Sequence, residues 1–280
     1  MQLQTNLKQQ RSIEEEFTSL EVVYEEEHAL AWYYMNGGSR PCFTPDVLHN
    51  ILKWYDAVKN GQKKDVGYIV AASRFEGSFN LGGDLALFSS LIRNQDRDGL
   101  LKYAIACIDV LYNTYTSLDG KVTTISLVQG DALGGGFEGA MSSDVLIAEK
   151  GVKMGFPEIL FNLFPGMGAF SLLARKIGAT EAETMILSGK LYSAEELYDK
   201  GIVHVLVNKG EGKRAVYDYI KKENRSKNGI TAFRKAKHCY DPISYEELEK
   251  ITTIWVDAAL NLNHRDLRMM ERLVKRQTVK

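Results

Sequence analysis

Residues 125–166 read ISLVQGDALGGGFEGAMSSDVLIAEKGVKMGFPEILFNLFPG. The pattern of this stretch predicts a buried strand, a glycine loop, a short helix and a second strand. A glycine loop that enters a helix presents free backbone N–H groups at the positive end of the helix dipole. Such a loop can stabilise an oxygen that becomes negative in a transition state, although it can also serve only as a tight turn.

Two carboxylates in this stretch have apolar neighbours. Glu138 lies within FEGAM, directly after the glycine loop, and Glu158 lies within MGFPEILFNLFPG. Burying a carboxylate is costly unless it is paired, hydrogen-bonded or protonated. Two carboxyls in one apolar cleft tend to have raised and separated pKa values, which suits an acid and a base. From the residues alone, two structural glutamates at helix starts remain an equal alternative.

An upstream segment has the same layout. The predicted buried strand DVGYIVAAS, at residues 65–73, precedes a second glycine loop within FNLGGDL, at residues 79–85. Two such loops from adjacent strands could each supply one N–H group to the same oxygen. Asp84, at the end of the second loop, is better explained as a helix N-cap than as a catalyst.

The rest of the chain predicts an α/β core with a helical C-terminal region. We divide it into a polar N-terminal segment, residues 1–17, a core domain, residues 18–210, and a helical region, residues 211–280. Within the core the pattern predicts a pair of strands over residues 20–26 and 28–36. It also predicts one helix over residues 45–60, a second over about 84–116, and a late strand over 202–207.

Composition narrows the class of protein. The 280 residues carry 35 lysines and arginines and 36 acidic residues, which argues against a nucleic-acid partner. Cys42, Cys107 and Cys239 are scattered and lack metal-ligand spacing, so we expect neither a disulfide framework nor a metal site. There is no signal-type apolar stretch and no run of 18 apolar residues, so we expect no membrane span and a cytoplasmic location.

Taken together, the long stretch and FNLGGDL resemble the crotonase, or enoyl-CoA hydratase/isomerase, superfamily from about Leu20 to the C-terminus. The resemblance implies a ClpP/crotonase-like spiral of ββα units, assembled as trimers or dimers of trimers. It also implies an oxyanion hole made by the N–H groups of Leu81 and Gly135, with Glu138 and Glu158 as the catalytic pair. The flanking glycines would contact the substrate, namely Gly82, Gly134 and Gly136.

Several segments are similar to one subgroup, the diffusible-signal-factor synthases of quorum sensing: FNLGGDLALF, GDALGGGFE, PEILFNLFPGMGAF and ITTIWVDAAL. This likeness implies dehydration of a 3-hydroxyacyl chain on acyl carrier protein to the cis-2-enoyl thioester, followed by thioester hydrolysis. The phosphopantetheine of acyl carrier protein or CoA would carry the substrate, with no other cofactor. A sensor-kinase receiver domain is a regulatory partner compatible with that likeness. Leu81 and Phe137 depart from common hydratases, which carry smaller residues there.

Further residues are candidates with structural alternatives. Met167, in the PGMG turn, and Trp255, in a helical segment, could line an acyl pocket or belong to the ordinary core. Cations in the helical tail could contact phosphopantetheine or an acidic carrier, but a solvated helix face is the favoured account: Lys221, Lys222 and Arg225. None of the five histidines sits near a G-x-S-x-G elbow, so a hydrolase triad is unsupported.

Two rival functions remain. An ordinary enoyl-CoA hydratase or isomerase of fatty-acid β-oxidation would use the same glutamates and keep the thioester intact. An inactive crotonase-fold scaffold would only bind a regulatory partner, and the presence of both glutamates argues against it. The residues leave open the acyl chain length, the carrier, the cis or trans product and the division of roles between Glu138 and Glu158.

Overall fold

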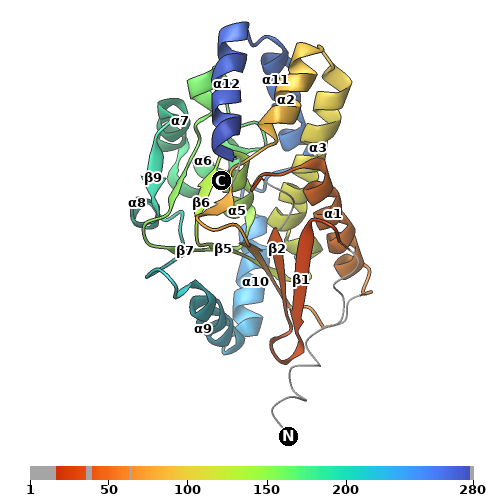
Figure 1. The fold of residues 1–280 in the computed structure, drawn as a ribbon. Helices are drawn as coiled ribbons and strands as arrows, with labels where there is room; N and C mark the ends of the chain where they lie inside the picture. The colour runs from red at the N-terminus through yellow and green to blue at the C-terminus, as the bar shows by residue number, and fades with distance from the viewer. Residues whose placement is uncertain (1–16, 36–39, 63–64, 278–280) are drawn as a thin grey trace, which may run out of the picture.

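A computed structural model describes residues 17–35, 40–62 and 65–277 (Figure 1). The predicted N-terminal segment, apart from its last residue, lies outside these ranges. In the described chain, helices surround two β-sheets, as the α/β prediction requires.

The larger sheet has six strands in the order β1-β2-β3-β5-β7-β10. The first two form an antiparallel pair, and every other neighbouring pair is parallel. The strands are β1 (Leu20–Glu25), β2 (Leu30–Met35), β3 (Tyr68–Ser73), β5 (Thr123–Val128), β7 (Val145–Glu149) and β10 (Val205–Val207). The predicted strand pair, the buried strand predicted at residues 65–73 and the late strand are therefore confirmed.

The smaller sheet was not predicted. Its order is β4-β6-β8-β9, with the first three strands parallel, and each strand has only three residues. The strands are β4 (Ser78–Asn80), β6 (Asp131–Leu133), β8 (Lys153–Gly155) and β9 (Leu191–Ser193). The chain places one strand in each sheet and then forms a helix, three times in succession. This repeat is the spiral of ββα units that the resemblance implies.

Helices cover the sheets and form the C-terminal region. They are η1 (Glu26–His28), α1 (Pro45–Lys59), α2 (Leu85–Arg93), α3 (Arg97–Tyr115), α4 (Ser117–Gly120), α5 (Gly135–Ser142), η2 (Glu158–Phe161), α6 (Ala169–Ile177), α7 (Ala179–Ser188), α8 (Ala194–Asp199), α9 (Gly212–Asn224), α10 (Lys227–His238), α11 (Tyr245–Leu260) and α12 (His264–Gln277). In α1, one face is buried as its apolar spacing predicts, from Val47 to Tyr55.

The single helix predicted over residues 84–116 is wrong, because the structure has two helices there. Gln95 adopts a left-handed conformation with φ of 52°, which interrupts helical geometry. Asp96 then begins the second helix, and its side chain accepts the Gly99 N–H at 2.9 Å. The break gives α2 and α3 different directions, and both contribute to the pocket described below.

The last four helices divide into two pairs. Figure 1 shows α11 and α12 at the upper end of the molecule, near α2 and α3, and α9 and α10 at the lower end. Helix α11 packs on α3, and α12 packs on α2 and η2, whereas α9 packs on β5 and β7. Half of the predicted C-terminal region therefore covers the part of the core that contains the glutamates.

Candidate active site

Three loops meet at one edge of the smaller sheet. Residues 81–84 follow β4, residues 134–136 follow β6, and residues 156–158 follow β8. Because these neighbouring strands are parallel, their carboxyl ends lie at the same edge. The topology therefore brings both glycine loops and Glu158 together, although they are far apart in sequence.

The two glycine loops are in close contact. A Cβ atom on Gly82 would lie 3.0 Å from the Leu133 carbonyl oxygen and 3.2 Å from the Gly135 nitrogen. Gly82 also has a φ of 92°, which residues with side chains rarely adopt. A side chain at this position would therefore both strain the loop and cover the Gly135 N–H group.

Glu138 is held by backbone donors in the interior. Its side chain is fully buried, and Oε1 accepts the N–H groups of Met167 and Ala169, each at 2.9 Å. Burial disfavours the charged carboxylate and raises the pKa of Glu138 to about 7, while the two hydrogen bonds oppose this rise. The result is a carboxyl group that can gain or lose a proton near neutral pH.

The side chain of Glu158 has fewer hydrogen-bond partners than that of Glu138. The residue as a whole is half-buried, but its Oε2 atom is buried and has no hydrogen-bond partner among the described residues. Burial, and secondly the negative charge of Glu138, raise the pKa of Glu158 to about 8. Its other oxygen lies against the glycine loop, since a Cβ on Gly134 would be 2.2 Å from Glu158 Oε1. The unpaired oxygen is available to a substrate or to water.

The structure corrects one of the two predicted oxyanion donors. The Leu81 N–H donates to the Pro41 carbonyl at 2.6 Å, and the Gly82 N–H donates to Asn80 Oδ1 at 2.8 Å. Both N–H groups therefore already have acceptors within the protein, Leu81 across to Pro41 and Gly82 on the preceding Asn80 side chain. The Gly135 N–H, at the start of α5, has no acceptor among the described residues. Gly83 also lines the pocket, and a Cβ on Gly135 would lie 3.6 Å from its nitrogen.

A pocket of about 210 Å³ contains both glutamates. Apolar side chains from α2, α3, η2 and α11 form most of its wall, including Phe88 and Phe161, and Leu163 lines it just after η2. Trp255 lines it too, with its ring 5.0 Å from that of Phe88. Met167 lies between the walls, with its Cε over Gly135. Such a site suits an apolar chain whose reactive end meets two carboxyl groups.

Two predicted residues lie outside this pocket. Gly136 packs against the backbone of Asn80 and does not line the pocket, because a Cβ there would be 2.1 Å from the Asn80 carbonyl oxygen. Phe137 is fully buried, with its ring 5.1 Å from that of Phe156, so it cannot shape the space around a bound carbonyl. Asp84 is an N-cap, as predicted, and accepts the Ala86 N–H at 3.1 Å.

Other expectations can be placed in the described chain. Lys221, Lys222 and Arg225 lie on and just after α9, and none of them lines the pocket. All three cysteines are free. Over residues 17–35, 40–62 and 65–277, no cluster of three or more metal-ligating side chains occurs. None of the helices in those ranges combines the length and apolarity needed to cross a membrane.

Sequence reasoning missed several contributors to the site. The backbone N–H of Ala169 and the side chains of Phe88 and Phe161 were not singled out, although all three contact or surround the glutamates. Phe88 falls in the helix that directly follows FNLGGDL, so its position was a usable signal. No local pattern indicated the role of Ala169, because it depends on how the chain returns to α5.

Comparison with known proteins identifies the family of this chain. The chain matches the enoyl-CoA hydratase/isomerase family over residues 42–266, and it belongs to that family. It is 35% identical over 160 residues to a probable enoyl-CoA hydratase of Rhizobium meliloti, covering 57% of this chain and 56% of the relative. It is 29% identical over 167 residues to the glyoxysomal fatty acid beta-oxidation multifunctional protein MFP-a of Brassica napus, covering 59% of this chain. The chain spans only 22% of the length of that protein.

Solved structures share the fold across nearly the whole chain. The enoyl-CoA hydratase of Bacillus halodurans superposes with a TM-score of 0.77 at 20% identity, covering 91% of this chain and 100% of the other. DspI of Pseudomonas aeruginosa superposes with a TM-score of 0.64 at 22% identity, covering 94% of this chain and 97% of the other. The predicted crotonase-type fold is thus confirmed.

Proposed function

We propose that the protein dehydrates a 3-hydroxyacyl chain carried on acyl carrier protein to the cis-2-enoyl thioester and then hydrolyses the thioester to release the free fatty acid. The observation that carries the proposal is the glutamate pair. One carboxyl group is held by two backbone donors, and the other has a buried oxygen without a partner. Both face a largely apolar pocket in a chain of the hydratase/isomerase family.

Dehydration needs a base and an acid at the same time. The base takes a proton from C2, the C3–O bond breaks, and the acid protonates the leaving hydroxyl to give water. Between about pH 7 and 8, Glu138 and Glu158 together hold one proton, so the pair supplies both functions. The Gly135 N–H would bind the thioester oxygen while negative charge develops on it.

Hydrolysis can use the same groups. Water attacks the carbonyl carbon, a carboxylate takes the proton from that water, and the oxyanion donor stabilises the tetrahedral intermediate before the thiol leaves. The unpaired Glu158 oxygen gives such a water a hydrogen-bond partner within the pocket. The likeness of four segments to diffusible-signal-factor synthases supports this second step.

Product analysis tests the proposal. The purified protein is given 3-hydroxydodecanoyl acyl carrier protein, the acid is examined by mass spectrometry and the free carrier thiol is measured with a thiol-reactive dye. Free cis-2-dodecenoic acid and a stoichiometric amount of thiol are expected. If only the trans-2-enoyl thioester forms and no thiol appears, the protein is an ordinary hydratase. If neither product forms with a folded protein, the inactive scaffold is the better account.

A further inference from the structure

Helix α12 lies directly beside the pocket. It packs on α2 and on η2, and both of these elements contribute side chains to the pocket wall. Asn162, at the end of η2, donates to Asp266 Oδ2 at 3.1 Å, which fixes the start of α12 against the wall. The outer face of α12 is therefore a surface that a large substrate carrier would meet.

That outer face is cationic. Arg265, Arg268 and Arg272 are exposed, and their spacing of three and then four residues places them on one side of the helix. The two acidic residues of the helix have other partners, because Asp266 binds Asn162 and Glu271 pairs with Arg93. Within the described part of the chain, none of these three arginines forms an ion pair.

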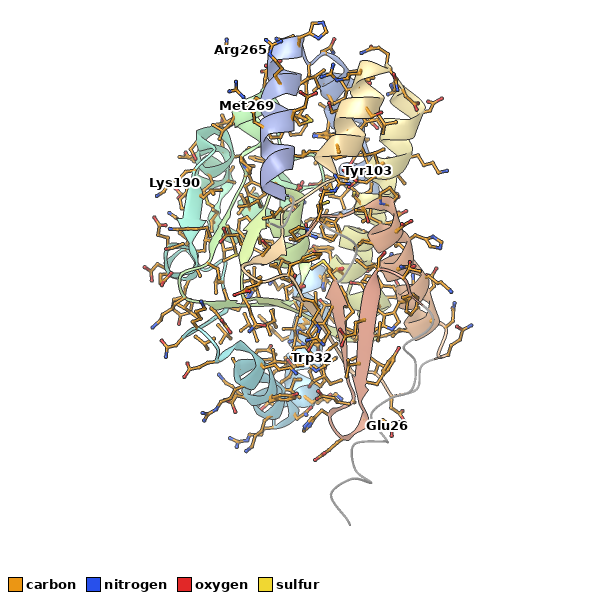
Figure 2. All side chains as sticks on the ribbon, in the orientation of Figure 1. Glu26, Trp32, Tyr103, Lys190, Arg265 and Met269 are labelled. Carbon is orange, nitrogen blue, oxygen red and sulfur yellow. The ribbon has the colours of Figure 1, made fainter. Side chains whose placement is uncertain are left out.

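An apolar border adjoins the arginines. Met269, one turn after Arg265, is 38% exposed. Leu160 and Leu191 line the pocket and are also exposed, at 57% and 36%. Figure 2 shows Arg265 and Met269 on the same side of the molecule as Lys190, the residue before Leu191. Because α12 packs on η2, which carries Leu160, the arginine-bearing helix adjoins exposed apolar surface at the pocket.

We propose that this surface docks the acidic carrier protein that delivers the acyl chain on its phosphopantetheine arm. The inference rests on the proposed function, which requires such a carrier. Arg265 and Arg272 are seven residues apart, so the charged face extends about 10 Å along the helix. This length, with an apolar border, suits an acidic helix better than the isolated phosphates of CoA. Complementary charge accelerates docking, and the exposed apolar side chains add contact area.

Charge reversal tests the inference. We would compare wild type with the triple variant Arg265→Glu, Arg268→Glu and Arg272→Glu. A matched control reverses three exposed cations at the other end of the molecule, as Lys221→Glu, Lys222→Glu and Arg225→Glu. Each protein is assayed with 3-hydroxyacyl carrier protein, with the corresponding CoA thioester and with its N-acetylcysteamine thioester, at low and high salt. Melting temperatures establish that every variant is folded.

The expected result is a fall in kcat/KM of about tenfold or more for the carrier protein in the α12 variant, larger at low salt. Activity on the N-acetylcysteamine thioester and activity of the control variant should remain near wild type. Equal losses on every substrate, equal losses in the control, or a loss confined to the CoA thioester would overturn the inference. A wild type that turns over the N-acetylcysteamine thioester but not the carrier protein would also overturn it and leave the chemistry standing. A wild type that turns over neither contradicts the proposed function itself.

Discussion

The backbone N–H of Met167 donates to Glu138 Oε1 at 2.9 Å, while the Met167 side chain covers Gly135. One residue therefore positions the Glu138 carboxyl group through its backbone and packs its side chain over Gly135. The Ala169 N–H donates to the same oxygen, so the turn after Pro165 fixes the orientation of Glu138 through the backbone alone. Side-chain changes in that turn leave these donors in place.

Replacing either glutamate by glutamine should abolish most of the activity. We expect Glu138→Gln and Glu158→Gln each to reduce turnover by about 10²–10⁴-fold, in both dehydration and hydrolysis, because one pair serves both steps. Glu149→Gln is the control, since Glu149 is buried but binds Gln129 and Gly212 away from the pocket. Steady-state assays of each folded variant measure the effect. Near-normal turnover by Glu138→Gln or Glu158→Gln would remove that residue from the mechanism.

The activity should have a narrow pH optimum. Below about pH 7 both carboxyl groups are protonated and the base is lost, whereas above about pH 8 both are ionised and the acid is lost. We therefore expect kcat/KM to reach its maximum between about pH 7 and 8 and to fall on both sides. A profile that stays flat from pH 5 to 10 would contradict a role for this pair.

Stability should depend on pH through Glu158. The pKa of Glu158 is about 8 in the folded protein, above the ordinary value of 4.5. Between these two pH values the folded protein therefore keeps a proton that the unfolded chain has lost. This contribution to the free energy of unfolding is fully present below about pH 4.5 and is lost as the pH rises to about 8. Glutamine does not titrate, so Glu158→Gln lacks this loss of stability. The melting temperature of Glu158→Gln minus that of wild type should therefore increase as the pH rises from 5 to 8. If the difference between the two melting temperatures stays constant from pH 5 to 8, Glu158 is not held buried and protonated.

Two neighbouring glycines should respond differently to alanine. At Gly134 the new Cβ would lie 2.2 Å from Glu158 Oε1, so Gly134→Ala displaces the Glu158 carboxyl group, and the positive φ of 53° adds strain. At Gly136 the Cβ would meet the Asn80 backbone, which cannot move as a side chain can. We expect Gly134→Ala to lose about 10²-fold or more in activity and Gly136→Ala mainly to lower the melting temperature. The reverse pattern would show that Gly136 is the one at the reacting centre.

Trp255 should influence which chain lengths are accepted. Trp255→Leu opens space in the pocket wall, and we expect a shift toward longer acyl chains along with lower stability. Discrimination of about 1–3 kcal/mol per methylene is typical of apolar pockets. Trp54→Leu is the control, because Trp54 is fully buried outside the pocket and should lower stability alone. If both variants keep the wild-type product profile, Trp255 is only a core residue.

Local sequence signals predicted much of this molecule. Glu138 and Glu158 were found because each carboxylate interrupts an apolar segment, and α1 was found because its apolar residues repeat with helical spacing. The short strands β4, β6 and β8 were missed, since three residues cannot show an alternating pattern. They matter because their common edge brings the loops together.

Other features depend on contacts between distant residues. The Leu81 N–H was assigned to the oxyanion hole, yet it binds Pro41, forty residues earlier, which no spacing within FNLGGDL indicates. The break at Gln95 came from a left-handed residue in a polar stretch that still allowed a helix on average. These misses reflect tertiary structure that overrides local preference.

The contact between Gly166 and Trp255 has a consequence for the order of synthesis. A Cβ on Gly166 would lie 2.2 Å from the indole, so the two residues are in close contact although 89 positions separate them. On the ribosome, the strands and loops that carry both glutamates emerge well before α11, and N-terminal parts of a chain can fold while the rest is made. Glu138 and Glu158 are therefore synthesised before Trp255, so the two carboxyl groups precede the α11 side of the pocket that surrounds them.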